Sequence, residues 1–225
     1  MPPTVQPRRT PQIDDPLAPA GAADLAHDAR LTSVLLTGSD LAGHRANGMS
    51  ITGSRLSDVN LAGAELAELQ LSDVRLERCN LANVRARRAR TRVADIGASR
   101  LTGAAFVESQ ITDATFRGCR MDLASFAAAK LERVTFEDCL LTQADFLEAS
   151  LLSVRFDGCD LSKLDLRGAR LIDCELRGCT LDGIEGAESL RGVSMPWADI
   201  VGSAGTWAAA LGIIVLDAEI EEESR

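Results

Sequence analysis

Large apolar residues recur at every fifth position over most of this chain. The series runs from Leu31 to Leu181 without a change of phase and weakens only at Ala86 and Thr91. A spacing of five fits neither the 3.6-residue period of an α-helix nor the two-residue period of a β-strand. An unbroken internal repeat of this kind predicts a solenoid over residues 31–185, with no inserted loop.

The positions around each large residue fit a short extended segment. Two residues earlier stands a small side chain, as at Ala64, Cys79 and Val134, and the residue between the two is mostly polar. Because residues two apart in an extended segment point the same way, both apolar positions face inward and the polar one faces water. The next two positions are rich in Thr, Ser, Asp and Gly, which predicts a corner.

A second period, of twenty residues, gives the number of faces in one coil. Like residues recur at this spacing in several columns. Three of the columns are Phe106, Phe126 and Phe146; Phe116, Phe136 and Phe156; and Cys79, Cys119, Cys139, Cys159 and Cys179. Like stacks on like when four pentapeptides complete one coil, so we predict a four-sided rod of roughly eight coils, each about 4.8 Å from the next.

The repeat resembles the pentapeptide-repeat family, whose motif is a small residue, Asp or Asn, Leu and two variable residues. The motif stands here as Cys79-Asn80-Leu81, Cys159-Asp160-Leu161 and Ala144-Asp145-Phe146. The resemblance covers residues 31–185. It implies an all-β solenoid, a right-handed quadrilateral β-helix, which agrees with the column pattern.

The segments that flank the repeat predict tails and caps. Residues 1–20 hold six of the seven prolines and no apolar period, which indicates a disordered tail. Residues 21–30 indicate a short helical cap. An open β-helix end exposes strand edges and apolar core, so we expect residues 186–217 to cap the other end with a helix and a strand. Residues 218–225 read as an acidic tail.

The C-terminal helix has signals at both ends. Ser194 is a candidate N-cap with Pro196 in the first turn, and Gly212 is a stop signal. Its apolar positions at helical spacing are Trp197, Ile200, Val201, Ala204, Trp207 and Leu211, and Ile214 follows in the expected strand. These residues cover the last coil, form a homodimer contact as such elements do in some relatives, or do both.

Composition narrows the range of functions. Hydrophobic residues make up 46% of the 225 residues and aromatic residues only 4%, which indicates a narrow core. The net charge of −9 argues against direct nucleic-acid binding, which requires a basic surface. We find no apolar stretch that could cross a bilayer and no signal peptide, so we expect a cytoplasmic protein that does not bind membranes.

Residue types that carry catalysis or bind metals are scarce or fall at core positions. The six cysteines stand at small inward positions, where free Cys packs as a small hydrophobe, and they lack the close pairs of a zinc site. His27 falls in the expected N-terminal cap, and His44 falls at an inward position where a hydrogen-bonded ring is expected. We therefore expect no catalytic residue, no metal and no cofactor, and a protein that is not an enzyme.

Two groups of charged residues are candidate partner-binding sites. The one dense basic cluster consists of Arg85, Arg87, Arg88, Arg90 and Arg92. It is either a solvated, irregular coil or a patch for an acidic partner. The best acidic stripe consists of Glu68, Glu108 and Glu148, which share a column that Arg88 interrupts.

We expect a non-enzymatic protein-interaction module whose partner the sequence does not specify. The resemblance implies an alternative, because the quinolone-resistance relatives mimic DNA, bind DNA gyrase in its place and protect it from poisons. The repeat body has 19 Lys and Arg against 22 Asp and Glu, a net charge of only −3. A continuous negative face would favour the DNA mimic, and a patchwork of charges would favour a scaffold.

Overall fold

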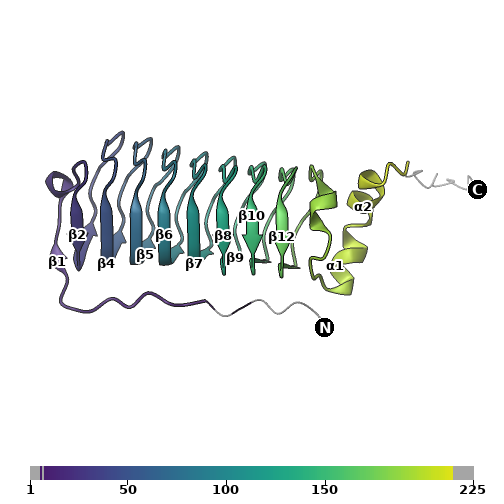
Figure 1. Cartoon of the computed structure of the whole chain (residues 1–225), viewed down its shortest axis with the longest axis horizontal. Helices are drawn as coiled ribbons and strands as arrows, with labels where there is room; N and C mark the ends of the chain where they lie inside the picture. The colour runs from purple at the N-terminus through teal and green to yellow at the C-terminus, as the bar shows by residue number, and fades with distance from the viewer. Residues whose placement is uncertain (1–5, 7, 215–225) are drawn as a thin grey trace, which may run out of the picture.

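Short parallel strands stack coil upon coil along most of the chain (Figure 1). The computed structural model describes residue 6 and residues 8–214. Within this part, thirteen strands form one parallel sheet. They are β1 (Ala18–Pro19), β2 (Arg30–Thr32), β3 (Val34–Thr37), β4 (Ser50–Ser57), β5 (Gln70–Glu77), β6 (Arg90–Gly97), β7 (Gln110–Arg117), β8 (Lys130–Glu132), β9 (Thr135–Glu137), β10 (Ser150–Leu152), β11 (Arg155–Asp157), β12 (Arg170–Ile172) and β13 (Glu175–Arg177).

The register between coils is twenty residues throughout the repeat. Leu76 of β5 pairs with Ile96 of β6, and Phe116 of β7 pairs with Phe136 of β9. The faces without named strands follow the same rule through single bridges, such as that between Asp145 and Asp165. Four pentapeptides therefore complete one coil, and the solenoid has about eight coils, as the column pattern predicted.

Aromatic ladders fill the centre of the rod. The rings of Phe136 and Phe156 stack with centroids 4.9 Å apart, and those of Phe126 and Phe146 with centroids 4.8 Å apart. The two ladders meet edge to face, at 6.1 Å between Phe126 and Phe136. Offset stacks and edge contacts are both favourable ring geometries, so ring contacts order the narrow core both along the rod and between the two ladders.

A 3-10 helix, η1 (Ala22–Asp24), closes the first coil. Leu25 follows it and is 2% exposed, so it covers the apolar interior at this end. The half-buried His44 places Nε2 against the carbonyl oxygen of Leu25, and His27 Nδ1 accepts a hydrogen bond from the Asn47 amide at 3.1 Å. Both histidines thus serve the N-terminal cap.

Residues 8–20, the arm, belong to the segment whose composition predicts a disordered tail, and the structure gives them an extended path; residues 1–5 and 7 of that segment lie outside the described residues. The arm runs back along the stacked coils from β7 to β1, as Figure 1 shows. The arm ends in β1, whose Ala18 pairs with Val34 of β3. A proline-rich segment is already extended, so it loses little conformational entropy when it lies along a rod, and the rod supplies acceptors for its free amides.

The C-terminal cap differs in detail from the prediction. It consists of η2 (Ala187–Leu190), α1 (Trp197–Gly202) and α2 (Ala204–Ala210), with a break at Ser203 instead of one continuous helix. Ser194 is no N-cap, because it pairs with Glu175 and extends the solenoid. Residues 213 and 214 form no strand; the rest of that expected strand and the acidic tail lie outside the described residues. No described helix is long and apolar enough to cross a membrane.

Gly186 marks the point where the chain leaves the repeat, and we expect its replacement by alanine to be costly. It has a φ of +74°, and an added Cβ would lie 2.6 Å from the backbone nitrogen of Arg167. Gly186→Ala should lower the free energy of unfolding by about 2 kcal/mol, from left-handed strain and the clash. Urea denaturation followed by circular dichroism measures the change.

Gly205→Ala is the matched control. Gly205 lies in α2, and a Cβ there meets no atom within 4 Å. Alanine is more favourable than glycine inside a helix, so the free energy of unfolding should stay constant or rise slightly. Equal losses in both variants would show that the backbone at Gly186 is not constrained.

Candidate interaction surfaces

Two arginines of the basic cluster form ion pairs with two glutamates of the acidic stripe. Arg88 Nη2 lies 2.9 Å from Glu68 Oε1, and Arg87 Nη2 lies 2.7 Å from Glu108 Oε1. The hydrogen bond from Arg87 lowers the pKa of Glu108. These paired, exposed groups therefore present little net charge to a partner.

The other members of these groups have different surroundings. Arg85 Nη1 lies 3.5 Å from Glu65 Oε1, on the next face of the coil. Glu148 and Arg90 form no ion pair among the described residues. Glu148 therefore differs from Glu68 and Glu108, which are both paired with arginine. Of the six predicted partner-binding residues, only Glu148 and Arg90 keep an unpaired charge.

Arg90 belongs instead to a column of cations on one face of the rod. The column consists of Arg30, Arg90, Lys130 and Arg170, and its other members are Ser and Gln. Arg90, Lys130 and Arg170 are in register on alternate coils, which places them about 10 Å apart at the normal strand spacing. Within the described residues none of the four forms an ion pair. We call this set the basic column.

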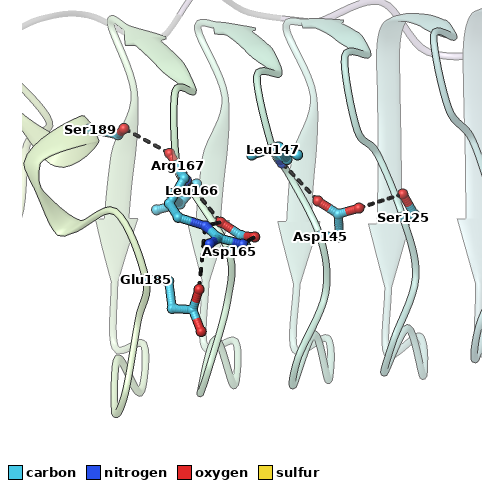
Figure 2. Close-up of polar contacts among 8 residues, drawn as sticks. All are labelled: Ser125, Asp145, Leu147, Asp165, Leu166, Arg167, Glu185 and Ser189. Atoms are coloured by element: carbon cyan, nitrogen blue, oxygen red, sulfur yellow. Dashed lines mark hydrogen bonds and ion pairs between the residues drawn. The ribbon is translucent and has the colours of Figure 1, made fainter.

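An acidic column lies on the neighbouring face, on the coils nearer the C-terminus (Figure 2). It consists of Asp145, Asp165 and Glu185, which are bridged in register on successive coils. We did not predict this set from the sequence, although its twenty-residue spacing contains the signal. We call it the acidic column.

Polar contacts hold the acidic column in place. Ser125 Oγ and the Leu147 amide each donate a 2.9 Å hydrogen bond to Asp145. Arg167 Nη2 lies 2.6 Å from Asp165, and Arg167 Nε lies 3.3 Å from Glu185 (Figure 2). The hydrogen bond from Arg167 lowers the pKa of Asp165, so this carboxylate stays ionised. One cation thus serves two carboxylates, and the column keeps a net negative charge.

The arm is held along a corner of the rod by backbone and side-chain contacts. The Arg9 amide donates to Asp113 Oδ1 at 3.2 Å, and the Gln12 amide donates to Asp73 Oδ1 at 3.4 Å. Asp15 Oδ1 lies 3.4 Å from Arg55 Nη1. Successive contacts step from β7 to β5 to β4, so the arm covers this corner over several coils.

The apolar residues predicted for the C-terminal helix divide between two environments. Trp207 is half-buried against the core, and its Nε1 donates a 3.1 Å hydrogen bond to the Ile200 carbonyl oxygen. Trp197 is 77% exposed and Ile214 is 85% exposed. The remaining exposed members are Ile200, Val201, Ala204 and Leu211. Trp207 therefore caps the coil, while the others leave an apolar surface at the end of the rod.

The cysteines occupy the core as predicted. Five of the six are buried and Cys179 is half-buried, and all are free thiols. Burial raises the pKa of the Cys174 thiol to about 11. The described residues contain no cluster of three metal-ligating side chains.

We expect the buried thiols to be protected in the folded protein. With Ellman's reagent at pH 7.5, only the half-buried Cys179 should react quickly, because the thiolate is the reactive form and burial disfavours it. All six should react in denaturant. Rapid reaction of several thiols in native buffer would contradict the core position of the column.

Comparisons with known proteins bear on the repeat. The family model described as pentapeptide repeats (8 copies) matches residues 29–66 and 54–90. The model described as pentapeptide repeat region matches residues 109–185. A search of the curated proteins by sequence found no match.

Several solved structures are similar to this chain. Trypsin-treated QnrB1, a plasmid-mediated fluoroquinolone resistance protein, is 20% identical with a TM-score of 0.38, over 84% of this chain and 100% of that one. HetL of the cyanobacterium Nostoc, a pentapeptide-repeat protein involved in heterocyst differentiation regulation, is 20% identical with a TM-score of 0.28, over 75% and 90%. The two family models together match more than half of the residues, and the twenty-residue register agrees with them. The chain belongs to the pentapeptide-repeat family and folds as a right-handed quadrilateral β-helix.

Proposed function

We propose that this chain is a non-enzymatic scaffold that binds another protein through its charged long faces. The observation that carries the proposal is the pair of unbalanced columns, one basic and one acidic, on neighbouring faces. The basic column lies in paired strands and the acidic column is joined by successive single bridges, so the charges of each column keep a constant spacing. Pentapeptide-repeat proteins generally act as structural or interaction modules, which supports a binding role.

A rigid column of like charges suits recognition more than stability. Exposed charges on one face repel one another weakly, and they steer and orient a partner of opposite charge. The basic column therefore favours an acidic protein surface, and the acidic column a basic one. A partner that spans the corner between them would contact both.

Charge reversal of one column tests this proposal. The triple variant Arg90→Glu, Lys130→Glu and Arg170→Glu should fold normally, because these side chains are exposed. When each protein is used as bait in a lysate of the source cells at low salt, proteins that bind the wild type should not bind this variant. Reversal of Arg78 and Asp58, an exposed pair on another corner, is the control that should keep them. Identical sets of captured proteins in all three experiments would refute binding through this face.

A DNA mimic that binds DNA gyrase and protects it from quinolones is the second candidate. The acidic column favours it, because its carboxylates repeat along the rod as phosphates do along DNA. Arg167 and the basic column on the neighbouring face argue against a DNA mimic, because a protein surface that binds DNA would meet cations there. We therefore rank it below the scaffold.

We also propose that the exposed apolar surface of α1 and α2 joins two copies of the chain end to end. Apolar side chains that are more than half exposed, such as Trp197 and Leu211, are typical of an interface. Val201→Glu should convert a dimer to a monomer in analytical ultracentrifugation without unfolding the repeat. A wild type that sediments as a monomer at high concentration would refute the dimer.

A further inference from the structure

An open cavity of about 580 Å³ lies between the arm and the rod. The arm contributes Arg8, Arg9 and Gln12, and the rod contributes Asp73, Arg92 and Val93. A cavity of this size can hold a small organic ligand. Its lining is polar and mainly cationic, so an apolar ligand is a poor fit.

The three arginines at this cavity lack the partners that most arginines of the rod have. Elsewhere twelve arginines form ion pairs, whereas Arg8, Arg9 and Arg92 form none among the described residues. Docking of the arm thus brings two cations next to a third on β6. Like charges held together disfavour the docked arm, and the nearby carboxylates offset this only in part, because one, Asp73, lines the cavity and the other, Asp113, is already paired with Arg133.

The charge balance indicates what kind of anion fits. Both oxygens of Asp73 are already engaged, one by the Gln12 amide and one by Ser72 Oγ at 3.3 Å. Three guanidinium groups and one carboxylate leave a net charge of about +2 at neutral pH. A phosphate monoester carries −1.5 to −2 at this pH, and its oxygens match the forked donors of arginine.

We propose that this cavity binds a phosphate monoester and that the bound ligand fastens the arm to the rod. The ligand contacts cations of both parts only when the arm is docked. By linkage, it binds the docked form, and the stabilisation of that form grows with the logarithm of the ligand concentration above Kd. The ligand is the phosphate group of a small molecule or of a modified protein side chain.

Calorimetric titration with phenyl phosphate at fixed ionic strength tests the site. Wild-type protein should bind one equivalent, and Arg92→Ala should weaken binding by about tenfold or more, because it removes a charged hydrogen-bond donor. The double variant Arg8→Gln and Arg9→Gln should weaken it as much. Arg100→Ala, which removes another exposed arginine of the rod that forms no ion pair among the described residues, should leave binding unchanged.

Trypsin supplies a second readout that separates a site from diffuse attraction. Phenyl phosphate should slow cleavage after Arg9 in the wild type but not in Arg92→Ala. Adenosine monophosphate and a short phosphoserine peptide, titrated in parallel, show which source of phosphate binds more tightly. No saturable binding up to about 10 mM, or equal losses in Arg92→Ala and Arg100→Ala, would overturn the proposal.

Discussion

Replacing Phe136 by alanine should lower the free energy of unfolding by about 3–5 kcal/mol, the range for a fully buried ring. Phe136 is 0% exposed and stacks between Phe116 and Phe156, at 5.0 and 4.9 Å between centroids. It also meets Phe126 and Phe146 edge to face. Alanine would leave a cavity in a rod too narrow to refill it. Chemical denaturation followed by far-ultraviolet circular dichroism measures the loss.

Phe106→Ala is the matched control, because Phe106 ends its ladder and is only half-buried. It stacks on one side alone, at 5.4 Å from Phe126. Its loss should be clearly smaller than that of Phe136→Ala. Equal losses would mean that the stability of the rod does not depend on continuity of the aromatic ladders.

The second large effect concerns the carboxylate that joins the arm to the rod. Asp113 is 3% exposed and accepts hydrogen bonds from Arg133 Nε at 2.7 Å and Nη2 at 3.1 Å, besides that of the Arg9 amide. Asp113→Asn keeps the shape, and Asn tolerates the φ of +56°. The substitution removes the charge and should lower the free energy of unfolding by about 3 kcal/mol.

The pH dependence of this cost has a defined sign. The hydrogen bonds from Arg133 hold the pKa of Asp113 below its usual value. A lowered pKa in the folded state means that the stabilisation is complete above the unfolded pKa of about 4 and is lost as the pH falls through the folded pKa. The stability gap between wild type and Asp113→Asn should therefore stay constant from pH 8 to pH 5 and narrow below pH 4.

Asp138→Asn controls for the backbone, since Asp138 has a φ of +51° but is exposed and forms no ion pair among the described residues. At every pH between 3 and 8, the free energy of unfolding of Asp138→Asn should be close to that of the wild type. If the gap for Asp113→Asn did not narrow in acid, or if Asp138→Asn showed the same gap, the ion pair with Arg133 would not be the cause.

The repeat made most of the fold predictable. A fixed register of twenty turns every sequence column into a stack, so the phenylalanine ladders and the core position of Cys79 to Cys159 follow from spacing alone. The ion pair between Arg88 and Glu68 was readable by the same rule. The residues of the acidic column have the same twenty-residue spacing, but they do not stand out in the sequence because the turns contain many other carboxylates.

The two ends were less predictable, because no repeat connects them to the rod. Proline content indicated a disordered tail, and the contact of Arg9 with Asp113 could not be predicted because it joins residues 104 apart without any period. At the other end, the helical pattern around Trp197 and Trp207 was visible in the sequence. Which side of the helix packs on the core was not, because the return of Ser194 to the solenoid fixes the orientation of the cap.

We propose that opposite charges on neighbouring faces make this rod a scaffold that binds another protein, and that it does not imitate DNA. A DNA gyrase supercoiling assay with purified protein, with and without a quinolone, tests it most directly. With protein well above the enzyme concentration, we expect unchanged supercoiling and unchanged drug sensitivity. Inhibition of supercoiling, or rescue from the drug, would contradict the claim and make the acidic column the functional face.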